Sequence, residues 1–480
     1  MTAAPAALFT VADLADAAGG RRAAGPADGS IGSVSIDSRS VGADALFVAL
    51  RGEHTDGHRF LAAAAAAGAR ALLVSEAEAG TRRAELTDLA ARGVTVIAAR
   101  DTLAALQRLA RVHLARLGLE ARVGVTGSSG KTTTKEILGA ILSRAAPTAV
   151  SGGNLNSETG VPLACFQVGT GHRWAVLEMG VNHPGEMAAL ADIVRPDLAL
   201  ITNIGTAHIG LLGSREAIAL EKKGIFSRFT GRETGFLPEG ERFFGLLAEG
   251  VRGRIVAYGP KSTPGYGGSE SLGLDGTLIH WEGSRARFPL GGAHNLANAL
   301  GAAAVARELG VAASAVREGL EAVRPLFGRS EILHGRGPTV LFDGYNANPD
   351  SMERALAWAS EVAWEGRRVA VLGGMRELGA ESAEAHRALA RSPVLAGFDL
   401  VFLLGEEMRP AFDELAATPA VARTAWEADA DPLARLLAAA VREGDLVLVK
   451  GSRGLELERL LPSLGVTGRG AAGKAAEGLS

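Results

Sequence analysis

Cysteine is almost absent from this chain of 480 residues, since Cys165 is the only one. A single cysteine excludes a disulfide framework, and we expect a reducing, cytoplasmic location. An excess of one charge is also absent, because 50 basic and 53 acidic residues leave a net charge of −3. Proteins that bind nucleic acids usually carry a basic face, so we expect no nucleic-acid partner.

Hydrophobic runs suited to crossing a membrane are missing as well. The uncharged residues 198–214 include Asn203, His208 and three glycines, which makes them a poor membrane span. The N-terminus has no basic segment and places Asp13 and Asp16 in its first apolar stretch, so we expect neither a signal peptide nor membrane insertion. The composition, 47 % hydrophobic and 21 % charged, is typical of a soluble globular protein.

Short apolar segments, each followed by a turn and a helical pattern, recur along the chain. This alternation is typical of an α/β protein with mainly parallel sheets, and the length predicts about three domains. We expect domains at 1–117, 118–325 and 326–466, followed by a disordered Gly/Ala-rich tail at 467–480.

The expected elements follow from these patterns. Residues 259–276 are rich in Gly, Ser and Pro and are predicted to be a loop. Helices are predicted at 58–68, 101–117 and 295–309. Strands are predicted at 32–36, 45–50, 71–74, 94–98, 122–126, 174–178, 198–202, 339–342, 368–372, 400–404 and 446–450, of which the last four would form a small doubly wound sheet.

The strongest local signal is the segment 123–134, where an apolar strand leads through a turn of small residues into a helix. Gly127 and Gly130 allow backbone N–H groups to point at a phosphate. Lys131 supplies a charge to the β- and γ-phosphates, and the Thr132 hydroxyl can ligate Mg²⁺. The alternative is an ordinary glycine turn before a helix. The loop predicts binding of a nucleoside triphosphate, but it does not indicate whether the protein is a GTPase, a kinase or a ligase.

Read with the motifs that follow it, this loop resembles the phosphate loop of the Mur ligase family of peptidoglycan synthesis. The other motifs occur in the family's order over nearly the whole chain, at 153–156, 160–162, 178–180, 203–208, 213–222, 294–298, 328–329, 343–349, 372–379, 386 and 449–453. The resemblance implies a three-domain architecture with a central P-loop ATPase-type domain and a C-terminal Rossmann-like domain. It also implies a monomeric, ATP- and Mg²⁺-dependent ligase that activates a carboxylate as an acyl phosphate in cell-wall biogenesis, and so in cell shape and division.

Two features resemble one member of the family, the one that adds D-Ala-D-Ala to the UDP-muramoyl tripeptide. Residues 345–349 resemble its third-domain signature, and 37–39, 46–52 and 56–58 resemble a UDP-sugar-binding domain. The nearest alternative is the member that adds the third amino acid to the UDP-muramoyl dipeptide. A folylpolyglutamate synthase is more distant. An alternative of another class is a P-loop switch that hydrolyses nucleotide to control a partner.

The resemblance assigns catalytic roles to Lys131, Glu178, His208 and Lys222. Glu178 ends an apolar strand, where α/β proteins place their sites, and by resemblance it ligates Mg²⁺. The alternative is that Glu178 is simply a charged residue in a loop after the strand, with no metal to bind. By resemblance His208 contacts a second Mg²⁺, against the alternative of a structural histidine. Lys222 would carry a carbamate, for which a buried, neutral amine is needed. The adjacent Lys223 leaves the register open, and a solvated lysine is the alternative.

Other residues are expected to bind substrates. By resemblance Asn295 and Asn298 contact adenine, although asparagine also caps helices. Arg329 and Asp343 would reach ATP from the third domain when the domains close. The ATP loop would comprise Gly127, Ser128, Ser129, Gly130, Lys131, Thr132 and Thr133. The remaining substrate-binding candidates are Ser38, Arg39, Asn154, Asn156, Asn346, Asn348, Ser452 and Arg453. The sequence departs from the family pattern at Pro238, Gly240, Gly344, Gly374 and Arg376.

Overall fold

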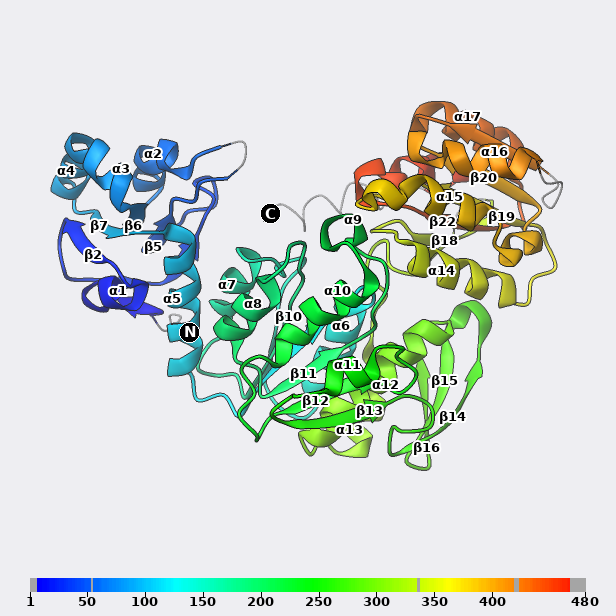
Figure 1. Ribbon diagram of the computed structural model, residues 1–480, viewed down its shortest axis with the longest axis horizontal. Coiled ribbons are helices and arrows are strands. Elements are labelled where there is room, and N and C mark those ends of the chain that lie inside the picture. The colour runs from blue at the N-terminus through cyan, green and yellow to red at the C-terminus, as the bar shows by residue number, and fades with distance from the viewer. Residues whose placement is uncertain (1–6, 53–54, 335–336, 418–422, 467–480) are drawn as a thin grey trace.

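The computed structural model describes residues 7–52, 55–334, 337–417 and 423–466. Three successive stretches of the chain build separate sheets, and the central unit (β8 to α13) lies between the first unit (β1 to β7) and the third unit (β17 to η8) (Figure 1). The expected α/β class with mainly parallel sheets is confirmed. The tail predicted at 467–480 lies outside the described residues.

The first unit contains a five-stranded sheet in the order β2-β7-β6-β5-β4, parallel except for β2, and a two-stranded sheet of β1 and β3. The strands and the helix predicted here are present with ends shifted by a few residues. Strands β1, β2 and β3 were not predicted. The elements are β1 (Phe9–Thr10), α1 (Val11–Ala18), β2 (Arg21–Ala24), β3 (Ser30–Ile31), β4 (Ser33–Ser35), β5 (Ala45–Val48), η1 (Gly57–Phe60), α2 (Leu61–Ala66), β6 (Ala69–Ser75), α3 (Glu76–Thr81), α4 (Arg83–Ala91) and β7 (Thr95–Ala99).

Helix α5 (Thr102–Arg116) joins the first unit to the central one. It begins where the Asp101 side chain accepts hydrogen bonds from the backbone N–H groups of Leu103 and Ala104, at 2.8 and 3.0 Å. The helix packs against α1 in the first unit and against α7 and α8 in the central unit. This continuous helix therefore connects the two units through packing on both sides.

The central unit is built on a fully parallel six-stranded sheet in the order β13-β12-β11-β8-β10-β9. Its elements are β8 (Ala121–Thr126), α6 (Lys131–Leu142), β9 (Thr148–Val150), α7 (Gly160–Cys165), β10 (Trp174–Glu178), α8 (Glu186–Val194), β11 (Leu198–Ile201), α9 (Ile209–Leu212), α10 (Arg215–Lys223), η2 (Gly224–Phe226), β12 (Thr234–Pro238), α11 (Phe244–Ala248), β13 (Arg254–Tyr258), α12 (Ala293–Glu308) and α13 (Ala313–Ala322).

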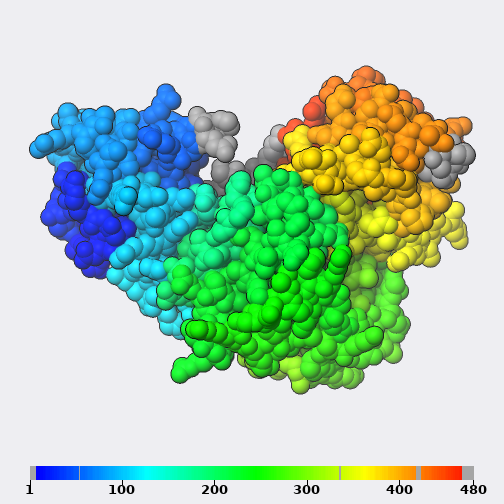
Figure 2. Space-filling model, in the orientation of Figure 1, coloured from blue at the N-terminus to red at the C-terminus, as the bar shows by residue number. Residues whose placement is uncertain are grey.

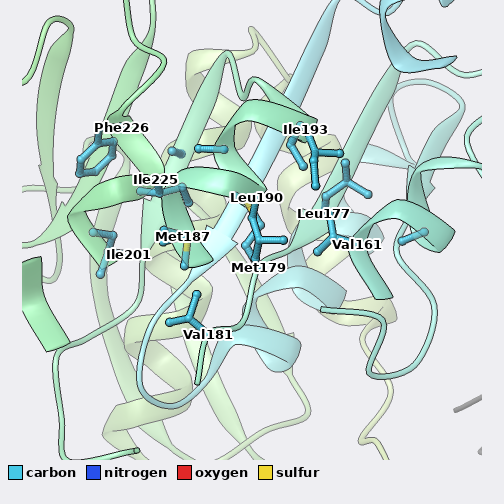
Figure 3. Packing of buried hydrophobic residues seen from close by; sticks show 14 of the residues in the cluster. Val161, Leu177, Met179, Val181, Met187, Leu190, Ile193, Ile201, Ile225 and Phe226 are labelled. Carbon is cyan, nitrogen blue, oxygen red and sulfur yellow. The ribbon is translucent and has the colours of Figure 1, made fainter. Parts of the chain in front are cut away.

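Both faces of this sheet are covered, which explains why its strands read as continuous apolar runs. Along β10, Trp174 and Val176 belong to the core beneath α6 and α12, whereas Ala175 and Leu177 face the opposite core. Figure 3 shows the opposite core, where Leu177 and Met179 lie among residues of α7, α8 and η2. The buried sheet gives a rigid base from which the loops at its carboxyl edge project.

One prediction in the central unit was wrong. Residues 259–276, expected to be a loop, contain β14 (Tyr266–Ser271) and η3 (Gly273–Asp275). Strand β14 pairs antiparallel with β15 (Thr277–Trp281), which also pairs with β16 (Ser284–Phe288). Gly267 and Gly268 removed the strand signal from the sequence, and pairing with β15 overrides the weak propensity of this edge strand.

The third unit has a six-stranded sheet in the order β17-β18-β22-β19-β20-β21, in which only β17 is antiparallel. The four strands predicted here are adjacent and parallel, as expected. The elements are β17 (Glu331–His334), β18 (Thr339–Asp343), α14 (Pro349–Glu361), β19 (Arg368–Gly373), η4 (Gly379–Glu381), α15 (Ser382–Ala390), η5 (Pro393–Gly397), β20 (Leu400–Leu404), η6 (Glu406–Met408), α16 (Arg409–Ala417), β21 (Arg423–Glu427), α17 (Ala430–Ala440), β22 (Leu446–Lys450), η7 (Arg453–Leu455) and η8 (Leu457–Leu464).

Figure 2 shows the first and third units on opposite sides of the central unit, with the surface hollowed between them.

Within the part of the chain that the structure describes, no helix is both long and apolar enough to cross a membrane.

Candidate active site

A cavity of about 1110 Å³ lies between the central and third units. Its walls include the start of α12, the loops that follow β8 to β12 in the central unit, and the loops that follow β18, β19 and β22 in the third unit. The loops all follow the carboxyl ends of parallel strands, where open α/β sheets place ligands. The predicted site residues that line it are Ser128, Ser129, Gly130, Lys131, Thr132, Thr133, Asn154, Asn156, Glu178, His208, Asn295, Asn298, Arg329, Asp343, Asn346, Asn348, Ser452 and Arg453. Gly127, Lys222, Ser38 and Arg39 do not line it.

The phosphate loop connects β8 to α6, and glycine is required at two of its positions. Gly127 has φ +149°, and a Cβ there would lie 1.8 Å from the Thr202 hydroxyl. Gly130 has φ +78°, and a Cβ there would lie 2.6 Å from Oδ1 of Asn298. The Lys131 Nζ donates to the Gly127 carbonyl at 2.8 Å, so the side chain folds back over the loop. Desolvation lowers the pKa of Lys131, and the charge of Glu178 opposes this shift.

The loop after β11 holds the phosphate loop in shape. Asn203 Oδ1 accepts hydrogen bonds from the backbone N–H and the hydroxyl of Ser129, both at 3.2 Å. The Thr202 hydroxyl donates to the Ser129 carbonyl at 2.6 Å, and the Gly205 N–H donates to the Ser128 hydroxyl at 2.8 Å. The sequence motif contained Asn203, but its contact with the phosphate loop was not predicted. The available signal was the position of Asn203, a polar residue that follows a predicted strand. That strand lies beside the strand that leads into the phosphate loop.

Glu178 ends β10 inside the protein and is 2 % exposed. Its Oε1 accepts a hydrogen bond from Asn156 Nδ2 at 2.7 Å, whereas its Oε2 is buried and has no hydrogen-bond partner. The fully buried Lys135 was missed by the sequence analysis. Its Nζ donates to the Ser151 carbonyl at 2.7 Å and lies 4.0 Å from Oε2 of Glu178. The spacing of one helical turn from Lys131 was the available signal.

His208 meets the third unit directly. Its Nδ1 lies 2.6 Å from Oε2 of Glu377, a carboxylate whose pKa is lowered by this contact. Both residues have positive φ, +61° for His208 and +63° for Glu377. The Gly210 N–H also donates to the Glu377 carbonyl at 3.1 Å. The histidine thus forms part of the contact between the units, which supports a structural role beside the predicted metal contact.

Lys222 is only 1 % exposed, whereas the adjacent Lys223 is partly exposed. Burial lowers the pKa of Lys222 well below its usual range, and the positive charge of Lys131 lowers it further. The Lys223 Nζ instead donates to the Leu246 carbonyl at 2.8 Å. The register question raised by the sequence is therefore answered in favour of Lys222 as the inward-facing lysine of α10.

Asn295 and Asn298 lie inside α12 and are buried. The helix begins after Gly292, so neither residue is the N-cap that the alternative interpretation required. Asn295 Nδ2 donates to the Gly291 carbonyl at 2.9 Å. Asn298 packs against Gly130, which brings an amide side chain to the phosphate loop.

The third unit contributes a second group of polar side chains. Lys450 Nζ, at the end of β22, donates to Oδ2 of Asp343 at 2.5 Å and to the Asn346 carbonyl at 3.1 Å. Arg329 places its guanidinium 3.9 Å from the centroid of the Tyr345 ring, a cation–π contact. The sequence motif contained Lys450, but its role as the partner of Asp343 was not predicted.

Several predicted substrate residues have structural partners here. Asn348 caps α14, since its Oδ1 accepts a hydrogen bond from the Ser351 N–H at 2.9 Å. Asn346 Oδ1 accepts from the Ala347 N–H at 2.9 Å, which is ordinary turn chemistry. Ser452 Oγ accepts from the Arg376 N–H at 2.9 Å, and Arg453 pairs with Glu458 at 2.6 Å.

Ser38 and Arg39 lie in the first unit, in the loop between β4 and β5. The Arg39 guanidinium pairs with Asp37 at 2.7 Å and is largely exposed. This contact lowers the pKa of Asp37. The structure therefore separates these two residues from the cavity between the central and third units.

The donors around Glu178 suit a magnesium ion shared with a phosphate. Among the described residues, no group of three or more His, Cys, Asp or Glu side chains could hold a metal by itself. Glu178 does, however, present one buried carboxylate oxygen without a hydrogen-bond partner, and Thr132 lines the same cavity. Mg²⁺ usually takes one or two protein oxygens together with substrate phosphates and water, so this donor set fits.

Comparison with known families agrees with this geometry. Three family models match successive parts of the chain: "Mur ligase family, catalytic domain" over residues 30–113, "Mur ligase middle domain" over 125–306, and "Mur ligase, glutamate ligase domain" over 328–453. The chain belongs to the Mur ligase family. The three-domain Mur ligase architecture expected from the sequence is thereby confirmed.

Individual relatives align with this Mur ligase over most of its length. The UDP-N-acetylmuramoyl-tripeptide–D-alanyl-D-alanine ligase of Treponema pallidum is 41 % identical over 90 % of the chain and 93 % of its own. The crystal structure of MurF from Acinetobacter baumannii superposes with a TM-score of 0.82 at 30 % identity, covering 95 % of this chain and 98 % of that one. MurF from Thermotoga maritima in complex with ADP superposes with a TM-score of 0.76 at 27 % identity, covering 90 % and 97 %.

Proposed function

We propose that this Mur ligase uses ATP to join D-Ala-D-Ala to UDP-N-acetylmuramoyl-tripeptide, a step of peptidoglycan precursor synthesis. The observation that carries the chemistry is the cavity in which the phosphate loop and Glu178, one of whose buried carboxylate oxygens has no hydrogen-bond partner, face polar groups of a second unit. The choice of substrates is supported by the 41 % identical relative, whose name states them, and by residues 345–349.

The phosphate loop would bind the β- and γ-phosphates of ATP. Backbone N–H groups at the start of α6 point towards such a phosphate, and Lys131 adds a positive charge. Glu178 and Thr132 would hold Mg²⁺, which supplies charge neutralisation between the phosphates and the incoming carboxylate. Asn156 and Lys135 keep the Glu178 carboxylate in place, because they lie 2.7 Å from Oε1 and 4.0 Å from Oε2, respectively.

The reaction would proceed in two displacements. The terminal carboxylate of the tripeptide attacks the γ-phosphorus, its new P–O bond replaces the bond to ADP, and an acyl phosphate forms. The amine of D-Ala-D-Ala then attacks the acyl carbon, loses a proton, and expels phosphate. Contacts between the third and central units, including the pair of His208 and Glu377, would exclude water while the acyl phosphate exists.

Lys222 would act through a carbamate formed with CO₂. Its depressed pKa favours the neutral amine that this reaction requires, and its burial protects the product. The carbamate would replace a cation with an anion and provide oxygens for Mg²⁺.

Each unit would have its own task. Residues 1–117, with Ser38 and Arg39, would bind the UDP-muramoyl part. Residues 118–325 would bind ATP, with Asn295 and Asn298 at the adenine. Residues 326–466 would bring Arg329 and Asp343 to the nucleotide, and Ser452 and Arg453 to the amine substrate.

Mass spectrometry of the reaction products tests the proposal. The enzyme is incubated with ATP, UDP-N-acetylmuramoyl-tripeptide and D-Ala-D-Ala, and the expected product is the corresponding UDP-pentapeptide with ADP and phosphate. A parallel reaction offers UDP-muramoyl dipeptide with single amino acids. Product only in this second reaction would favour the ligase for the third residue, and ATP hydrolysis without any acceptor would favour a P-loop switch.

A further inference from the structure

Arg354 of the third unit touches the phosphate loop of the central unit. It lies on α14, and its NH1 donates to the Ser129 hydroxyl at 3.1 Å, although 225 residues separate the two in sequence. The side chain is partly buried and lines the cavity. Across the described ranges Arg354 forms no ion pair, and the contact with Ser129 is its one hydrogen bond.

A guanidinium without an acidic partner, placed beside the phosphate loop, favours binding of an anion. Removing a charge from water without a partner is costly, and proteins usually compensate with an opposite charge. The other cation at this loop, Lys131, is turned onto the Gly127 carbonyl. A polyphosphate is the anion for which this loop is shaped, and a guanidinium binds phosphate oxygens through several N–H groups at once.

Contacts on both sides of Arg354 fix the position of α14. One turn earlier, Asp350 Oδ2 accepts hydrogen bonds from the Thr206 N–H at 2.8 Å and the Thr206 hydroxyl at 2.7 Å, and Oδ1 accepts from Arg215 at 2.5 Å. One turn later, Trp358 packs so tightly that a Cβ at Gly291 would lie 2.4 Å from its ring. Residues four apart share one face of a helix, so this face of α14 is docked on the central unit.

We propose that Arg354 binds the polyphosphate chain of the nucleotide, so that the third unit supplies a phosphate-binding cation only when α14 is docked on the central unit. This inference rests on the proposed function, because it takes the ligand of the loop to be a nucleoside triphosphate. It adds a positioning and binding residue that the sequence motifs did not include. It also implies that nucleotide binding stabilises the docked arrangement of the two units.

Calorimetric titration of the full-length enzyme tests the inference, with a non-hydrolysable ATP analogue and adenosine as separate ligands. Arg354→Gln should weaken analogue binding by about tenfold to a hundredfold, the range for losing a hydrogen bond to a charged group, and should change adenosine binding less than about twofold. Arg354→Lys, which keeps the charge but loses the planar fork, should give an intermediate affinity for the analogue. Arg387→Gln, outside the cavity on α15, is the matched control.

The outcomes separate binding from structure. Unchanged analogue binding in Arg354→Gln overturns the inference, and so does an equal loss for analogue and adenosine, which would indicate a purely structural contact. If Arg354→Gln does not fold, Arg354→Lys decides: an analogue affinity equal to that of the wild type rejects the role. Formation of UDP-pentapeptide by the wild-type enzyme is measured separately, so failure of the proposed function and failure of this inference are distinguishable.

Discussion

The central unit holds the phosphate loop with contacts made inside the unit. The third unit also holds its own polar groups, as Lys450 holds Asp343, but the position of these groups over the phosphate loop depends on contacts between the units. Ser129 is fixed by Thr202 and Asn203, and Glu178 by Asn156, all within the central unit. In contrast, the third unit is held against the central unit by contacts such as those of Asp350 on α14 with Thr206 and of Glu377 with His208. The phosphate site is therefore preformed, and the groups added by the third unit are available only when the two units are docked.

This difference predicts which variants harm the chemical step and which harm the assembly of the site. A substitution in the preformed side should lower turnover without changing the arrangement of the units. A substitution at the contact between units should act on nucleotide affinity and turnover together, because both depend on docking.

The largest effect is expected for Lys131→Ala, on the preformed side. Losing the charge beside the phosphates should lower turnover by about a hundredfold or more. Product formation in the full reaction measures this effect, and Lys261→Ala, a lysine outside the cavity, serves as the control. Turnover close to that of the wild type would contradict the role of Lys131.

The second-largest effect on turnover is expected from a comparison of variants at two adjacent lysines, Lys222 and Lys223. Lys222→Ala should lower turnover by about tenfold to a hundredfold, because it removes the buried group that would carry an anionic carbamate. Added short carboxylic acids should partly restore its activity. Lys223→Ala, which removes only the contact with the Leu246 carbonyl, should lose less than about threefold and show no rescue. Equal losses in both variants without rescue would exclude the carbamate.

The sequence predicted the preformed side better than the docked side, for a physical reason. Gly127 and Lys131 belong to a strand–loop–helix pattern whose geometry is local, and Glu178 directly ends an apolar strand. Asp350 and Arg354 have no local signature, because their partners, Thr206 and Ser129, are distant in the sequence.

The errors outside the site have the same origin. Strand β14 was predicted to be a loop, because its glycines carry no strand propensity and only pairing with β15 defines it. Asn348 illustrates the converse case. Its motif was recognised, but its position as the N-cap of α14 is defined only by the hydrogen bond that its side chain accepts from the Ser351 N–H.

A smaller effect is expected for Asp350→Asn, at the contact between the units. The amide can still accept the Thr206 N–H but loses the charge that holds Arg215, so docking should weaken. We expect turnover to fall about fivefold and the apparent KM for ATP to rise by a similar factor. Steady-state kinetics at varied ATP measure both values, and Asp431→Asn, an exposed partner of Arg459, is the control. A fall in turnover with an unchanged KM would contradict the coupling.

The smallest effect concerns pH and His294, which lies at the start of α12 against Trp358 of α14. Desolvation lowers the pKa of His294 to about 4, from a usual value of 6.5. Between these values the unfolded chain binds more protons than the folded one, so the free energy of unfolding should rise with pH across this window and level off above 6.5. His294→Gln should flatten that rise. The difference between its melting temperatures at about pH 4.5 and about pH 7 should be about 1–3 °C smaller than in the wild type. The remaining slope belongs to other groups, including His113 and His386, whose pKa values burial also lowers. An identical slope in the variant and the wild type would show that the contact between α12 and α14 does not keep this imidazole neutral.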